Sequence, residues 1–223
     1  MPSEQQLRYE IVRLGRMMHE RGFTAACDGN LSCRLDERRM LLTPSGLCKG
    51  MLEAEDLVVA DLSGHKLEGR HGVSSETAMH VLIYRVRPDV NAVVHAHPPT
   101  ATGFAVAGIA MDAPVLAEML VSLGSVPVAP YGTPGTPELA AALEPHVAEH
   151  DAVLMANHGV VCCGPDLVRA YLCMELVEHA AKILLVARQL GGAQELNPEE
   201  TAKLRRQRDA YGVPAEVPVP VRR

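Results

Sequence analysis

Residues 93–98 read VVHAHP, an apolar segment that ends in two histidines one residue apart. The apolar residues predict a buried strand over 92–96, and Pro98 marks its end. In a strand, residues i and i+2 point to the same face, so His95 and His97 are expected to present their imidazoles side by side. This arrangement suits two metal ligands, and two hydrogen-bonded surface histidines would account for it equally well.

A third histidine, His158, favours the metal site. It follows the apolar segment 152–155 and precedes Gly159, at a turn where the backbone can approach a ligand closely. Three histidines from two strand ends meet the requirement of a catalytic zinc site, which needs neutral nitrogen ligands and one open position. Glu76, at the start of a predicted helix, would be a fourth group that can ligate the metal and act as a base. Roles at the surface or in helix packing account better for the remaining histidines, which are His19, His65, His71, His80, His146, His150 and His179.

On both sides of residues 93–98, helical and strand patterns alternate along the chain, as in α/β and α+β proteins. Apolar periodicity and turn residues predict helices at 4–21, 76–86, 137–149 and 165–190, and strands at 31–35, 40–43, 57–61, 92–96, 152–155 and 160–162. No composition shift marks a linker, so we expect one domain over residues 1–223. The charged, proline-bearing segment 193–223 is expected to form a partly mobile tail.

The composition excludes several classes of partner. The chain is 48% hydrophobic and 22% charged, which is ordinary for a soluble globular protein. Its 21 basic and 27 acidic residues give a net charge of −6, so no global positive field attracts nucleic acid or an anionic membrane. No apolar run is long enough to span a bilayer, and the six cysteines contain no C-x-x-C pair. We expect a cytoplasmic protein whose cysteines are small buried apolar residues.

Three turns carry small hydroxyls and exposed amides, at 29–32, 43–46 and 74–75. Each turn alone is explained by local capping. Together they can form a phosphate cradle without many basic side chains, because backbone amides and a helix N-terminus supply partial positive charge. Lys49 would add a full charge to this cradle, although a solvated lysine is the better account of it.

Taken in order, these motifs resemble those of the class II aldolase/adducin family. The matching stretches are DGNLS at 28–32, TPSG at 43–46, SSE at 74–76, HAHP at 95–98, YGTPGT at 131–136 and NHG at 157–159. The resemblance extends from about the first helix to Gly192. It implies an α+β fold of three layers, with a central and mainly antiparallel sheet flanked by helices. It also implies a homotetramer with active sites between neighbouring subunits.

The resemblance further implies a zinc-dependent aldolase. One zinc or other divalent ion per subunit would be held by His95, His97 and His158, with Glu76 as the acid/base. The substrate would be a small (deoxy)ketose 1-phosphate, such as L-fuculose 1-phosphate or 5-deoxyribulose 1-phosphate, cleaved into dihydroxyacetone phosphate and an aldehyde. The residues implied to hold its phosphate are Gly29, Asn30, Ser45, Gly46, Ser74 and Ser75.

Two positions distinguish branches of the family. Epimerases of this family typically carry an aspartate where this chain has Glu76, which favours aldol cleavage. Fuculose phosphate aldolases carry a tyrosine proton donor near the position of Glu118, so Glu118 is a candidate second acid/base that could reach a neighbouring subunit's site. The alternative is an interface or surface carboxylate. A glutamate there resembles methylthioribulose-1-phosphate dehydratase. A dehydratase or a decarboxylase therefore remains an alternative activity, and an adducin-like binding module without catalysis ranks last because all three histidines are present.

Overall fold

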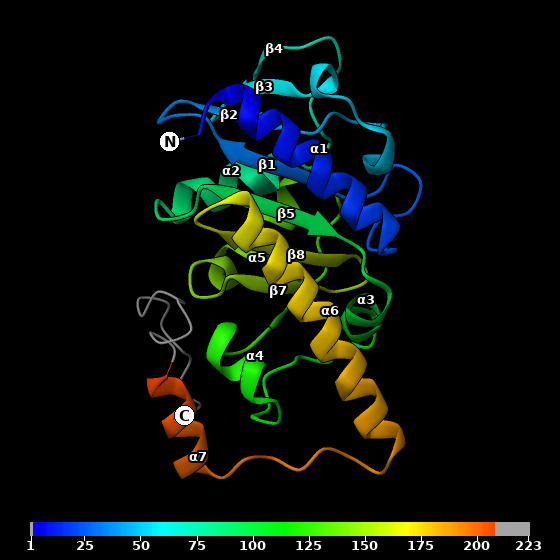
Figure 1. The fold of residues 1–223 in the computed structure, drawn as a ribbon, viewed down its shortest axis with the longest axis vertical. Coiled ribbons are helices and arrows are strands. Elements are labelled where there is room, and N and C mark those ends of the chain that lie inside the picture. The colour runs from blue at the N-terminus through cyan, green and yellow to red at the C-terminus, as the bar shows by residue number, and fades with distance from the viewer. Residues whose placement is uncertain (1, 208–223) are drawn as a thin grey trace.

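The computed structural model describes residues 2–207, which are built around one eight-stranded sheet (Figure 1). The strand order is β4-β3-β2-β1-β5-β8-β7-β6, and every neighbouring pair is antiparallel except the parallel pair β6 and β7. The strands are β1 (Asn30–Arg34), β2 (Arg39–Leu42), β3 (Val58–Asp61), β4 (Lys66–Glu68), β5 (Ala92–Ala96), β6 (Val128–Ala129), β7 (Ala152–Met155) and β8 (Gly159–Gly164). The expected sheet, mainly antiparallel, is confirmed.

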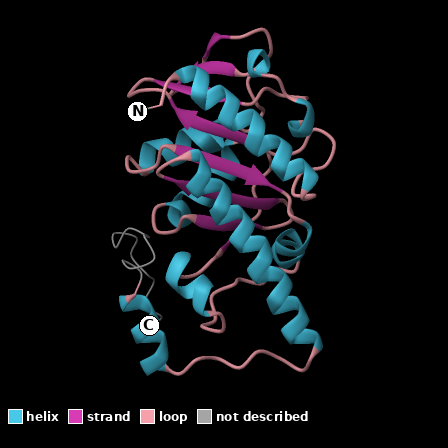
Figure 2. Cartoon of the chain, in the orientation of Figure 1, coloured by secondary structure: helices cyan, strands magenta, loops and turns pink. Residues whose placement is uncertain are grey.

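Helices cover both faces of this sheet and give the three layers seen in Figure 2. One face is covered by α1 (Glu4–Glu20), α3 (Pro99–Val106) and α6 (Leu167–Gln189), and the other by α2 (Thr77–Val86) and α5 (Pro137–Val147). Each face has its own hydrophobic cluster. Successive side chains of β5 point to opposite faces of the sheet and so belong to different clusters. Val93 packs on the side of α2 and α5, and Val94 packs on the side of α1 and α6. The three-layer α+β prediction is therefore confirmed.

Several short elements were not predicted. The strands β4 and β6 and the helices α3, α4 (Ala117–Ser122) and α7 (Pro198–Arg206) have too few residues to show a clear period. Helix α7 lies within the segment expected to be a mobile tail. Asn197 caps it through a hydrogen bond to the Glu200 amide, Pro198 starts it, and it packs against α4. The rest of the predicted tail, 208–223, lies outside the described residues.

Among residues 2–207, no helix combines the length and the apolar character that crossing a membrane requires.

Candidate functional site

The sheet itself positions the three histidines. His95 lies near the end of β5, opposite Asn30 of β1 and Val161 of β8, and its side chain is fully buried. His97 follows the end of β5, and His158 lies in the turn between β7 and β8. The next residue in that turn is Gly159, where an added Cβ would lie 2.4 Å from Cδ2 of His97. Glycine is needed here so that the two histidine-bearing segments can approach one another.

The three imidazoles converge as metal ligands do. Their ring centroids are 4.8–5.2 Å apart, and one nitrogen from each lies within 4.8 Å of the others. Nδ1 of His95 donates a hydrogen bond to the Val160 carbonyl at 2.9 Å, so Nε2 is the ring nitrogen that faces the cluster, 3.2 Å from Nε2 of His97. Burial, with the charges of His95 and His158, lowers the pKa of His97 to about 4 and keeps it in the neutral form that binds metal. The donor set therefore fits a divalent ion with imidazole ligands.

Glu76 closes the open side of this cluster from the start of α2. Its two oxygens lie 3.2 Å from Nε2 of His95 and 3.1 Å from Nε2 of His158. Burial alone would raise the pKa of Glu76, but the charge of His95 and the hydrogen bonds from His158 and His95 outweigh it and hold that pKa well below its ordinary value. The carboxylate is thus held in its ionised form in this arrangement.

A chain of buried hydrogen bonds orients Glu76 from behind. Because a carboxylate only accepts, Asn30 presents its amide nitrogen to Glu76 at 2.8 Å and its oxygen to Nε2 of His80. Nε2 therefore carries the proton, and Nδ1 accepts from the Ser32 hydroxyl at 2.7 Å. Tyr84 completes the chain with a hydrogen bond to Ser32. His80 had no motif to mark it in the sequence, although its position one helical turn after Glu76 places it on the same helix face.

This buried histidine makes stability depend on pH. Burial, together with the charge of His95, lowers the pKa of His80 to about 3 in the folded protein, compared with about 6.5 in an unfolded chain. Between these pH values the unfolded chain binds one more proton, so the free energy of unfolding falls by ~1.4 kcal/mol per pH unit as the pH drops. We expect His80→Gln to remove this contribution. Urea unfolding at pH 6.5, 5.5 and 4.5 would measure it.

His179→Gln is a matched control, because His179 also lies on a helix but is exposed. Its unfolding free energy should follow the pH dependence of the unaltered protein. Identical pH dependence in His80→Gln and the unaltered protein would show that His80 is not held neutral by burial.

The cluster opens into a cavity of about 230 Å³, which suits a small metabolite. The three turns expected to bind an anion meet here, and all six residues predicted to hold phosphate contribute to the lining. The Asn30 side chain donates one amide hydrogen to Glu76 and accepts from His80, which leaves the second hydrogen of its amide for an anion. Glu118 is not brought to this cavity within one chain, since it is exposed on α4. The lining residues are Cys27, Asp28, Gly29, Asn30, Pro44, Ser45, Gly46, Lys49, Ser74, Ser75, Glu76, His97, Pro134 and His158.

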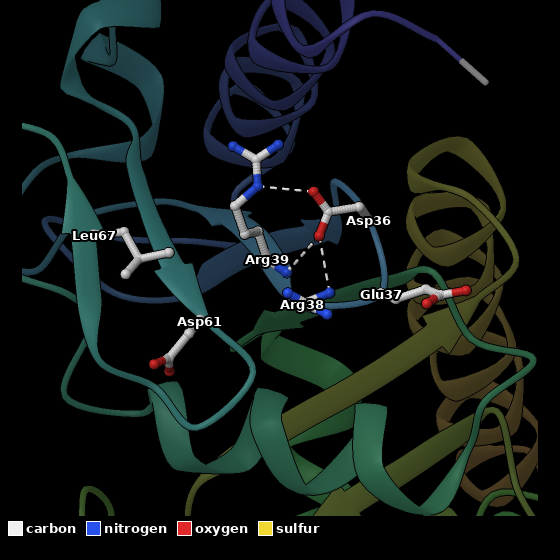
Figure 3. A pocket seen from close by; sticks show the side chains of 6 residues that line it. All are labelled: Asp36, Glu37, Arg38, Arg39, Asp61 and Leu67. Atoms are coloured by element: carbon white, nitrogen blue, oxygen red, sulfur yellow. Dashed lines mark hydrogen bonds and ion pairs between the residues drawn. The ribbon is translucent and has the colours of Figure 1, made fainter.

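A second hollow, shown in Figure 3, lies around the turn between β1 and β2. That turn follows Arg34, at the opposite end of β1 from Asn30 and the histidines. Asp36 accepts hydrogen bonds from the backbone of Arg38 and Arg39 and pairs with the Arg39 guanidinium at 2.7 Å. These groups satisfy one another at the surface, so this hollow is not the better candidate for a reaction site.

Comparison with known proteins identifies the family to which this chain belongs. Residues 9–185 match the sequence profile of the Class II Aldolase and Adducin N-terminal domain, which is most of the chain. The chain belongs to the class II aldolase and adducin family. The expectation of a metal-dependent lyase of the fuculose-aldolase type is thereby confirmed.

Relatives within this family are named either as aldolases or as decarboxylases. A 5-deoxy-D-ribulose 1-phosphate aldolase of Bacillus thuringiensis is 34% identical over 210 residues, covering 93% of this chain and 98% of that protein. A 3-oxo-tetronate 4-phosphate decarboxylase of Pectobacterium atrosepticum is 37% identical over 190 residues, covering 83% of this chain and 87% of that protein. A solved structure of L-fuculose 1-phosphate aldolase superposes with a TM-score of 0.85 at 32% identity, covering 93% of this chain and 96% of that one.

Proposed function

We propose that this class II aldolase uses zinc to cleave a small (deoxy)ketose 1-phosphate, such as L-fuculose 1-phosphate or 5-deoxyribulose 1-phosphate, into dihydroxyacetone phosphate and an aldehyde. The observation that carries this proposal is one small cavity lined by two chemically different sets of residues. His97, His158 and Glu76 line it in front of the buried His95, and so do three turns rich in amides and hydroxyls. A donor set of imidazole nitrogens favours zinc over magnesium or calcium, which prefer oxygen ligands.

The residues in and around the cavity would have different roles in such a reaction. A divalent ion held by His95, His97 and His158 would supply a Lewis acid for the negative charge that develops on the substrate carbonyl and its neighbouring hydroxyl. Glu76 would take up a proton from solvent and donate it to the substrate carbon once the carbon–carbon bond has broken. Asn30 keeps the carboxylate in place by its 2.8 Å hydrogen bond. The amides of the turns would hold the phosphate and so place the reacting carbons beside Glu76.

Decarboxylation is a second candidate, favoured by the relatives that are named decarboxylases. The two reactions have a common product. In a 3-oxo-tetronate 4-phosphate, loss of the carboxyl carbon leaves three carbons with a central carbonyl and a terminal phosphate, which after protonation is dihydroxyacetone phosphate. Retro-aldol cleavage of a ketose 1-phosphate leaves the same fragment. The leaving group, carbon dioxide or an aldehyde, is what separates the two activities.

The leaving aldehyde demands a second base that carbon dioxide does not, because its hydroxyl must lose a proton as the bond breaks. Among the lining residues, Asp28 lies 3.4 Å from Nδ1 of His97 and helps to orient that ligand, and Glu76 serves the substrate carbon. Glu118 could act as this base only in the cavity of a neighbouring subunit. Our proposal therefore includes a homotetramer with active sites at its interfaces, which would give Glu118 that access.

A panel of substrates tests this proposal. L-Fuculose 1-phosphate, 5-deoxyribulose 1-phosphate and 3-oxo-tetronate 4-phosphate would each be incubated with the zinc-loaded protein, and dihydroxyacetone phosphate, aldehyde and carbon dioxide would be measured separately. We expect dihydroxyacetone phosphate and an equal amount of aldehyde from at least one ketose phosphate. Carbon dioxide from the oxo acid, with no aldehyde from either sugar, would replace the aldolase by the decarboxylase. Chelator-treated protein is the control and should be inactive.

A further inference from the structure

Lys49 is buried beneath the candidate anion site. It begins the short 3-10 helix η1 (Lys49–Met51), and only 1% of its surface is exposed. The prediction of a solvated lysine is therefore wrong. The reason lies in α1, where a Cβ added at Gly15 would lie 2.9 Å from the Lys49 carbonyl. Because Gly15 has no side chain, α1 packs directly onto the backbone of η1 and covers the lysine.

The ammonium of Lys49 connects two of the turns that line the cavity. Its Nζ donates to the Cys27 carbonyl at 2.9 Å and also to the Leu47 carbonyl. Cys27 directly precedes the turn that contains Gly29, and Leu47 directly follows the turn that contains Gly46. Lys49 itself lies along the lining of the same cavity. The positive charge is thus placed between the two turns.

This positive charge has no anionic partner in direct contact. Within residues 2–207 the lysine ion pairs involve Lys182 and Lys203, and none involves Lys49. Burial lowers the pKa of Lys49, while Asp28 and Glu76 favour its charged form from a longer range. Removing an ammonium from water is unfavourable unless an anion or polar groups compensate it, and an apolar side chain would fill the same volume without that penalty. A bound anionic ligand would compensate the charge of this buried lysine.

We propose that Lys49 is the buried cation of this anion site and that it provides the selectivity for a phosphate dianion over an uncharged sugar. The amides and hydroxyls of the turns make the direct hydrogen bonds, and the ammonium between the turns supplies the full charge that partial dipoles lack. This inference rests on the proposed function, since it assumes a phosphorylated substrate. It adds a binding residue that motif comparison alone would treat as a surface lysine.

Binding of inorganic phosphate tests the inference without requiring turnover. The zinc-loaded protein and its Lys49→Met variant would be titrated with inorganic phosphate by calorimetry at pH 8, where the dianion dominates. We expect the Kd to rise by about 10- to 100-fold in the variant, the range expected for losing one charge-assisted interaction. Zinc content should not change, because Lys49 does not contact the histidines.

Two further variants separate charge from structure. Lys49→Gln removes the charge but retains an amide that can donate to one of the two carbonyls, so it should lose phosphate affinity as Lys49→Met does. Lys66→Met removes an exposed lysine of β4 and should leave the Kd unchanged. Unchanged phosphate affinity in folded Lys49→Gln would overturn the proposal and leave Lys49 as a structural clamp, as would an absence of phosphate binding in the unaltered protein. Phosphate binding that depends on Lys49 would support it even if no substrate of the panel were cleaved.

Discussion

Replacing Glu76 by glutamine is expected to lower turnover by about 10²- to 10⁴-fold, the usual contribution of a general acid or base. The glutamine side chain has nearly the same shape and can still lie beside Asn30, His95 and His158. It cannot accept a proton at the pH of the reaction, so proton exchange at the substrate carbon should stop. The three histidines remain, and most of the bound metal should be retained.

Two measurements would check the Glu76→Gln variant. Loss of hydrogen from dihydroxyacetone phosphate in heavy water, followed by NMR, reports the proton transfer separately from carbon–carbon cleavage. Metal analysis of the same sample reports the ligands. Glu68→Gln, an exposed change on β4, is the control and should leave both measurements unaltered. Loss of metal from Glu76→Gln as complete as that caused by removing a histidine would mean that Glu76 serves mainly as a ligand.

The sequence was most informative where function depends on local geometry. The spacing of His95 and His97 predicts two imidazoles on one strand face, and the structure places them there with ring centroids 4.9 Å apart. The serines before Glu76 are typical caps and predict a helix start at this point, which is confirmed, although the N-cap residue of α2 is Glu76 itself and no side chain caps the helix. Such features depend on a few neighbouring residues, so one sequence is enough to predict them.

The surroundings of the site depend on contacts between distant segments, which a period or a spacing does not encode. Lys49 is buried only because Gly15, 34 positions earlier, lets α1 approach. His80 becomes important because Asn30, on the distant strand β1, uses both ends of its amide. Glu118 resembled a catalytic carboxylate by its position in the chain, yet α4 leaves it exposed and away from the cavity of its own subunit. In each case the tertiary partner decides what the side chain does.

Removing His158 is expected to lower metal binding and turnover together, because its imidazole is one of the three candidate ligands. His158 lies in the turn between β7 and β8, where its loss disturbs the sheet less than loss of fully buried His95 would. We expect His158→Ala to weaken zinc binding by at least about 100-fold, more than the loss of a residue that only supports a ligand. Turnover should fall by at least about 10³-fold, since a Lewis acid contributes several kcal/mol to catalysis.

Thermal unfolding with and without added zinc distinguishes a metal ligand from a residue that only shapes the turn. A ligand that binds the folded state alone raises the unfolding temperature by mass action, so the unaltered protein should gain stability from zinc and His158→Ala should gain almost none. His158→Cys should recover part of that gain, because a thiolate is also a zinc ligand. His65→Ala, at an exposed position, should behave as the unaltered protein does. If His158→Ala kept a full equivalent of zinc and its thermal response, the metal would have to be held without this turn, and the close approach that Gly159 permits between His97 and His158 would have another purpose.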